Sequence, residues 1–178
     1  MRNAQYIFDE LLVTMVWSGD RSAKEELARR WHPRLLRAAR RMLAEDEPAH
    51  GVTQECWVAI IGGIHRLSDP ARFAPWAFTI LRRKCADAIR HKQDRRARES
   101  EGEMPDIASH ADTGEELAIL QAFAMLPPDQ RLAAHLFFVE GLTLAEIAAV
   151  QDIPTGTAKS RLFHARRKLK AALSGDTP

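Results

Sequence analysis

The sequence predicts an all-α protein of two small helical domains joined by a flexible acidic linker, the second domain carrying a helix-turn-helix. Apolar residues recur at helical spacing through most of the 178 residues, and no stretch alternates polar and apolar residues as a strand would. That spacing fails from Asp94 to Gly114, and residues 99–116 hold seven Asp or Glu and no Lys or Arg. Few apolar residues and a high net charge are typical of a flexible linker.

The first predicted domain, residues 1–94, is divided into helices by its breakers and caps. Gly19 ends the first helix, and Asp20 can cap the next one. Pro33 lacks the backbone donor that a helix interior uses, so we expect the second helix to stop and restart there. Pro75 suits the first turn of a long fourth helix. The expected helices cover residues 5–17, 22–31 with a continuation to 43, 49–61, and 75–92.

The second predicted domain, residues 115–178, follows the linker at 95–114. Thr143 with Glu146 three residues later forms a capping box that starts a short helix. Residues 151–154 are a tight break, after which a longer helix begins. Two helices across such a turn form a helix-turn-helix. The expected helices cover residues 115–125, 128–140, 143–150 and 155–172.

The last helix has the faces of a DNA reader. Residues 156–171 hold six Lys or Arg and no Asp or Glu. In helical projection, one apolar stripe would pack on the domain, and the opposite side is polar with basic flanks. Such a helix suits a major groove, where its front reads base edges and its flanks meet phosphates. The expected apolar stripe is Ala158, Leu162, Ala165, Leu169 and Ala172, and the expected front is Ser160, Phe163, His164 and Arg167.

The end of the first domain is also basic, with eight Lys or Arg between residues 82 and 98. Arg83, Asp87 and Arg90 share one helix side that we expect to be exposed. Aromatic residues precede this run at positions 73, 76 and 78. They suit either a buried core, which we favour for each one, or platforms for unstacked bases.

The total charge of +2 conceals this distribution, because residues 1–98, 99–116 and 117–178 carry +7, −7 and +2. Such asymmetry favours a polyanionic partner. No apolar run is long enough to span a bilayer, and the N-terminus does not have the pattern of a signal peptide. Cys56 and Cys85 have no nearby partner in sequence, which indicates buried thiols in a cytoplasmic protein. No hydrolase, phosphate-loop or metalloenzyme motif occurs, so we expect no enzyme, cofactor, metal or small-molecule substrate.

Several separated segments, in their order, carry a family resemblance. They are Trp31-His32-Pro33-Arg34-Leu35-Leu36; Thr53-Gln54-Glu55-Cys56-Trp57; Phe73-x-x-Trp76-x-x-x-Ile80-x-Arg82; Leu126-Pro127-Pro128-Asp129-Gln130-Arg131; and Glu146-Ile147-Ala148 with Gly156-Thr157-x-Lys159-Ser160-Arg161-Leu162-x-x-Ala165-Arg166. Over residues of about 8–172, the chain resembles the extracytoplasmic-function (ECF) sigma factors of bacterial RNA polymerase, within the sigma-70 family.

The resemblance implies that the first domain binds the largest-subunit clamp helices of core polymerase and the melted minus-ten element. The second domain would bind the minus-thirty-five element as duplex, and the linker would run through the core enzyme. Core polymerase and promoter DNA are the implied partners, and an anti-sigma factor is a further candidate. The implied site residues are Gly51, Gln54 and Glu55 for polymerase; Arg82, Arg83, Asp87 and Arg90 for the minus-ten element; and Thr157, Lys159, Ser160, Arg161, Phe163, His164, Arg166 and Arg167 for the minus-thirty-five element.

The chain departs from the family at three places. His50 and Gly51 stand where acidic residues are usual, Arg83 replaces an asparagine, and His164 replaces an arginine. Histidine titrates near neutral pH, so the contact at His164 is expected to be weaker or pH-dependent. Two alternatives stay open: a stand-alone helix-turn-helix regulator, which would bind duplex operator without polymerase, and a sigma-like protein that has lost polymerase binding.

Overall fold

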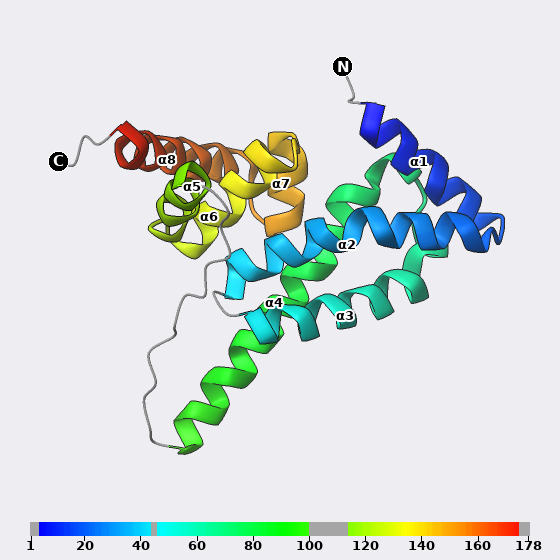
Figure 1. Ribbon diagram of the computed structural model, residues 1–178, viewed down its shortest axis with the longest axis horizontal. Coiled ribbons are helices and arrows are strands. Elements are labelled where there is room, and N and C mark those ends of the chain that lie inside the picture. Colours follow the sequence, from blue (N-terminus) through cyan, green and yellow to red (C-terminus); the bar gives the residue numbers. More distant parts are fainter. Residues whose placement is uncertain (1–3, 44–45, 100–113, 175–178) are drawn as a thin grey trace. The chain divides into compact units, whose positions relative to one another are not determined.

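The computed structural model describes residues 4–43, 46–99 and 114–174 (Figure 1). Within these ranges every regular element is a helix and no strand occurs, which confirms the predicted all-α class. The chain forms two compact units, one of residues 1–39 and 47–101 and the other of residues 40–46 and 102–178. Most of the predicted acidic linker, residues 100–113, lies outside the described residues.

The first unit is built from four α-helices with two short 3-10 turns before the last of them. Two of these helices differ from the sequence prediction. The helix through Pro33 is continuous, because Trp31 and Leu35 on either side are buried and their packing offsets the missing hydrogen bond. The fourth helix continues past Lys92, through residues that mostly have good helix propensity. The elements are α1 (Ala4–Trp17), α2 (Arg21–Leu43), α3 (Asp46–Gly63), η1 (Ile64–Arg66), η2 (Pro70–Arg72) and α4 (Phe73–Glu99).

Trp31 of α2 lies at the centre of the first unit's core. Its indole packs edge-on against Phe73 of α4, with ring centroids 4.9 Å apart, and lies 5.7 Å from Phe78. All three side chains are almost completely buried. For Phe73 and Phe78 the core interpretation is therefore the one that holds, and these rings are not platforms for bases.

Trp76, the third aromatic residue of this group, is half-buried and lies against Gly63 at the end of α3. A Cβ atom on Gly63 would stand 3.2 Å from the Trp76 ring, so glycine allows this close approach. Trp17 at the end of α1 donates a hydrogen bond from Nε1 to the Ile64 carbonyl oxygen at 2.8 Å. These contacts fix the path from α3 through η1 toward α4.

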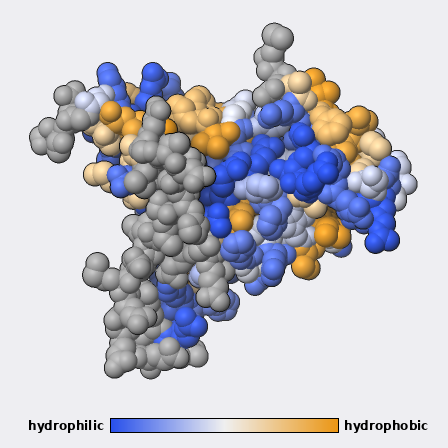
Figure 2. All heavy atoms as spheres, in the orientation of Figure 1, coloured by the Kyte–Doolittle hydropathy of each residue, from blue (hydrophilic) through white to orange (hydrophobic). Residues whose placement is uncertain are grey.

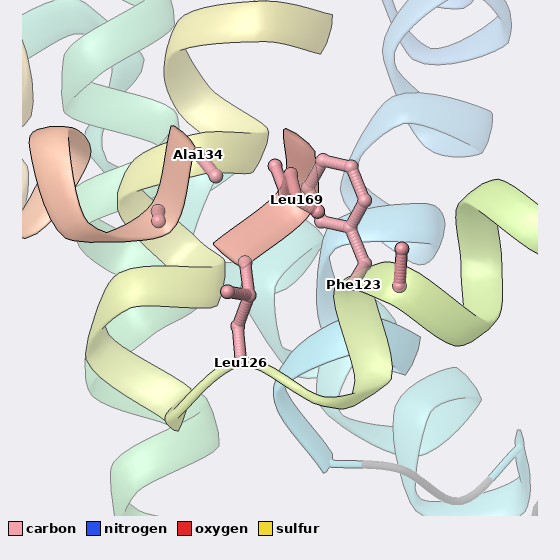
Figure 3. Packing of buried hydrophobic residues seen from close by; sticks show 6 residues of the cluster. Phe123, Leu126, Ala134 and Leu169 are labelled. Carbon is pink, nitrogen blue, oxygen red and sulfur yellow. The ribbon is translucent and has the colours of Figure 1, made fainter. Parts of the chain in front are cut away.

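The second unit packs four α-helices around a small apolar core. Phe123 and Leu126 point toward Leu169 of the last helix, beside Ala134 (Figure 3). The sequence predicts one helix over residues 128–140, but a π-helical turn replaces its second half. The elements are α5 (Gly114–Ala124), α6 (Pro128–Ala134), the π-helical turn η3 (His135–Val139), α7 (Leu144–Gln151) and α8 (Thr155–Ser174).

The π-helical turn encloses a buried polar pair. The Glu140 backbone N–H donates to the His135 carbonyl oxygen, and His135 Nε2 lies 3.4 Å from Glu140 Oε1. Both side chains are buried. The wider π-type hydrogen bonding thus brings a carboxylate beside an imidazole, which periodicity in the sequence does not reveal.

Candidate nucleic-acid interfaces

The helix-turn-helix of the second unit has the predicted caps. The Thr143 hydroxyl accepts a hydrogen bond from the Glu146 backbone N–H at 3.3 Å, and the Glu146 carboxylate accepts one from the Thr143 N–H at 2.8 Å. At the other end of α7, Asp152 adopts a left-handed conformation with φ of 54°. Two helix termini are satisfied in this way, and the chain turns directly into α8.

Helix α8 has a buried back and an exposed front. Ala158, Ala165 and Leu169 are buried as predicted, whereas Leu162 is only half-buried and Ala172 is exposed. The prediction for Ala172 is wrong because the last turn of α8 projects beyond the core that ends at Leu169. The predicted DNA-binding residues that are exposed are Thr157, Lys159, Ser160, Phe163, Arg166 and Arg167.

Two predicted DNA-binding residues of α8 differ from the others. Arg161 is half-buried, donates to Gln151 Oε1 at 3.1 Å and forms an ion pair with Asp129 Oδ2 at 2.8 Å. Gln151 in turn donates to the Asp129 carbonyl oxygen at 2.8 Å. Arg161 therefore already ties α8 to α6 and α7. His164 is half-buried, with its ring centroid 5.6 Å from that of Phe163, whose side chain is 63% exposed.

On α4 of the first unit, three of the four predicted minus-ten residues share one helix face, and Arg82 lies to the side of it. Arg83, Asp87 and Arg90 are exposed, and the Asp87 carboxylate lies 3.9 Å from the Arg90 guanidinium. Arg82 is half-buried, and its Nε atom has no hydrogen-bond acceptor among the described residues. The α4 surface is thus positive, with one carboxylate between its arginines.

On α3, the predicted polymerase-binding residues Gly51, Gln54 and Glu55 are all exposed. Glu55 Oε2 accepts a hydrogen bond from Lys84 Nζ of α4 at 3.1 Å, which joins this face to the basic helix. Val58 and Ile61 continue the same helix face with exposed apolar side chains, Val58 at 74%. Sequence reasoning missed these two residues, although their helical spacing from Gln54 could have revealed them.

The second unit exposes another apolar set that sequence reasoning missed. Phe137, Phe138 and Val139 of η3 are partly exposed, and the two phenyl rings contact edge-on with centroids 5.2 Å apart. Met125 is 77% exposed. An uninterrupted α-helix was expected there, so no signal in the sequence marked this surface.

The described residues show no group of His, Cys, Asp and Glu side chains that could hold a metal ion. Among the same residues, no helix is both long and apolar enough to cross a membrane. Cys56 and Cys85 are free and fully buried, and burial raises the pKa of each thiol to about 12. A thiol held protonated in this way is a poor nucleophile.

Comparisons with known proteins agree with the order of the two units. The Sigma-70 region 2 family matches residues 27–95, and the Sigma-70, region 4 family matches residues 116–169. RNA polymerase sigma factor CarQ of Myxococcus xanthus is 31% identical over 159 residues, which cover 87% of this chain and 91% of CarQ. ECF RNA polymerase sigma factor SigM of Mycobacterium tuberculosis is 29% identical over 164 residues, which cover 92% of this chain and 83% of SigM.

Two solved structures resemble the chain. CnrH in complex with the cytosolic domain of CnrY is 26% identical with a TM-score of 0.67, covering 96% of this chain and 99% of that one. The sigma factor RpoE of Bartonella quintana, solved with the anti-sigma factor NepR, has a TM-score of 0.78 at 24% identity. That match covers 89% of this chain and 100% of the other, and it indicates the fold alone.

Proposed function

The chain belongs to the ECF subfamily of the sigma-70 family of RNA polymerase sigma factors, and we propose from this membership how its residues share the work. It is a sigma factor, a transcription initiation factor that binds core polymerase and directs promoter-specific initiation. The proposed assignment is residues 1–94 for the clamp helices and the minus-ten element, residues 95–114 as linker, and residues 115–178 for the minus-thirty-five element. We propose that it acts in the cytoplasm and catalyses no reaction itself.

The minus-thirty-five contact is proposed to lie on the exposed front of α8. Thr157, Ser160 and Phe163 present two hydroxyl groups and an apolar ring, which suit base edges and a thymine methyl group in a major groove. Arg167 lies on the same front, Lys159 and Arg166 flank it, and these three exposed basic side chains suit phosphates. The proposal rests on one observation: the second helix of a capped helix-turn-helix presents an exposed, basic surface.

Arg161 and His164 are proposed to act at the edge of this surface. Because the Arg161 guanidinium is bonded to Asp129 and Gln151, we assign it chiefly the positioning of α8, with a phosphate contact from its remaining N–H groups. His164 would reach DNA beside Phe163, where its imidazole carries a full charge only when protonated.

The first unit is proposed to meet DNA through α4 and polymerase through α3. Exposed Arg83 and Arg90 offer donors to the melted minus-ten strand, and Asp87 can accept from exocyclic amino groups. Arg82 would support them from its half-buried position. Gln54 and Glu55 would contact the clamp helices, with Gly51 on the same exposed face. An anti-sigma factor is a further proposed partner, since CnrH and RpoE were each solved with another protein bound.

Run-off transcription with core polymerase and the purified chain, over a pool of promoters, tests this function. We expect transcripts only when both proteins are present, from promoters that share two spaced elements. The variant Lys159→Gln should weaken transcription from all of them. The control Arg21→Gln should not, since this exposed arginine of α2 is assigned to neither promoter element. Tight binding of the chain alone to a duplex operator, without promoter selection by polymerase, would favour a stand-alone regulator instead.

A further inference from the structure

We propose that the first unit carries an additional nucleic-acid surface, on α1 and α2, that binds single-stranded promoter DNA. The proposal rests on the sigma-factor function given above and concerns residues outside the α3 and α4 sites. The surface consists of arginine side chains of α2 held against aromatic side chains of the unit. We call it the arginine–aromatic face, and it comprises Tyr6, Phe8, Arg30, Arg34 and Arg37.

A buried carboxylate orients two of these arginines. The side chain of Asp9 on α1 is only 4% exposed. Its Oδ1 atom accepts a hydrogen bond from Arg30 Nε at 2.9 Å, and its Oδ2 atom accepts one from Arg34 Nη1 at 3.3 Å. Charge-assisted hydrogen bonds to this one carboxylate fix the direction of both guanidinium groups.

Aromatic rings support the same arginines. The Arg30 Cζ atom lies 4.8 Å from the centroid of the Phe8 ring. The Arg34 Cζ atom lies 3.7 Å from the centroid of the Trp31 ring and 5.8 Å from that of Tyr6. Cation–π contacts at these distances hold the guanidinium groups in place. Phe8 remains 41% exposed, so part of its ring stays available for another flat partner.

Arg37 extends the positive row along α2. At about 100° per residue it falls within 60° of Arg30 and Arg34 in helical projection. Its side chain is exposed and forms no ion pair with any residue that the structure describes. Figure 2 shows strongly hydrophilic atoms over α2 next to apolar atoms over α1, where Ile7 and Leu11 are exposed.

This combination favours a single strand over the other polyanions. A duplex offers phosphates to the arginines but keeps its bases stacked, so the exposed Phe8 and Ile7 would gain nothing. Proteins that bind single strands combine a basic track with aromatic side chains on which unpaired bases stack. An initiation factor meets such a strand when the promoter melts. The face therefore fits phosphates and bases of melted promoter DNA.

The test uses holoenzyme reconstituted from core polymerase and the full chain with Arg37→Gln or with Phe8→Leu. The matched control is Arg21→Gln, an exposed arginine half a turn from Arg30 in projection and paired with Glu25. Affinity is measured for a promoter fork whose nontemplate strand is single-stranded, and for the fully duplex promoter. Both variants should bind the fork about five- to tenfold more weakly than the wild type, and the control should match the wild type.

The salt dependence gives a second readout. For Arg37→Gln, the slope of log K against log salt on the fork should be shallower by about 0.7, the value for one phosphate of a single strand. Phe8→Leu should leave that slope unchanged, since the ring carries no charge. If Phe8→Leu lowers the melting temperature, the exposed Arg37→Gln variant still decides the matter.

Three results would overturn the proposal. Unchanged fork binding by Arg37→Gln would remove the face from DNA recognition. Equal losses on fork and duplex, with no effect of Phe8→Leu, would mean that it binds duplex phosphates. Weaker affinity for core polymerase alone would mean that the face binds protein. A wild-type chain that gives no run-off transcript would instead refute the sigma-factor function, which separates the two failures.

Discussion

His164 stands on α8 where the family resemblance leads us to expect an arginine. It is half-buried beside Phe163, on the helix that we propose reads duplex DNA. The flanking Lys159, Arg166 and Arg167 are exposed basic side chains. An arginine at position 164 would add a guanidinium with a fixed charge and several donors beside them.

We expect His164→Arg to bind minus-thirty-five duplex about fivefold more tightly than the wild type, since one exposed ionic contact is worth up to roughly 1 kcal/mol. Fluorescence anisotropy with a labelled duplex measures the two affinities. Identical affinities of the variant and the wild type would remove His164 from the interface.

The thiols of Cys56 and Cys85 give a second prediction, on stability. Burial raises the pKa of both thiols from the ordinary value of 9.0 to about 12, so above pH 9.0 the folded state keeps protons that the unfolded state releases. Their contribution to stability is complete below 9.0 and is lost as pH rises toward 12. Each thiol should then lower the free energy of unfolding by about 1.4 kcal/mol per pH unit within that window.

Urea unfolding of the first unit between pH 8 and pH 10.5 checks this slope. A Cys56→Ala, Cys85→Ala double variant is the control, since it keeps the lysines and arginines but lacks the thiols. If the double variant loses stability with pH as steeply as the wild type, the thiols are not the cause.

At the scale of elements, apolar periodicity and caps predicted α1, α7 and α8 closely, because each has one buried stripe and a clear terminator. Three elements differed from the prediction. Burial of Trp31 and Leu35 carries α2 through Pro33. Backbone propensity carries α4 past Lys92. The π-helical turn replaces the second half of the helix expected over residues 128–140, and it brings His135 beside Glu140.

In the candidate site, features set by one helix were predictable from the sequence, and features set by contacts between helices were not. The front of α8 was predictable from helical projection, since it needs only one helix and its spacing. The engagement of Arg161 by Asp129 and Gln151 was not, because it joins three helices across a turn. The ion pairs of Asp9 with Arg30 and Arg34 could not be predicted from the sequence either, because they join residues of two helices.

The turn between α7 and α8 yields a prediction for an element. Asp152 has a φ of 54°, a region that glycine adopts without strain and β-branched residues avoid. Asp152→Gly should leave the second unit equally stable or stabilise it by up to about 1 kcal/mol, whereas Asp152→Val should destabilise it by about 1–2 kcal/mol. Thermal unfolding followed by circular dichroism measures the difference, and a valine variant as stable as the glycine variant would contradict it.

At the scale of the whole molecule, the opposed charges of the chain's segments hide a strongly basic terminal helix within a total of +2. Ionic attraction to DNA depends on where the charges meet phosphates, so the total is a poor guide to binding. An average charge near zero and a local concentration on α8 together favour weak binding by the chain alone, with polymerase supplying the remaining contacts.

This distribution predicts a measurable salt effect. If the basic residues of α8 and its neighbours neutralise about six phosphates, log K for minus-thirty-five duplex should fall against log salt with a slope of about −5. Lys159→Gln should make the slope shallower by about one, and Arg21→Gln in the other unit should leave it unchanged. A wild-type slope near zero would mean that the basic flanks of α8 face something other than DNA.

The aromatic core around Trp31 belongs to the unit that also holds the other tryptophans, so the two units differ in intrinsic fluorescence. All four tryptophans, at positions 17, 31, 57 and 76, and the single tyrosine at position 6 belong to the first unit. Intrinsic emission excited at indole wavelengths therefore comes from that unit alone, and the second unit is silent. A change of this emission when DNA or a protein partner is added would therefore report on the first unit, the one that contains Trp31.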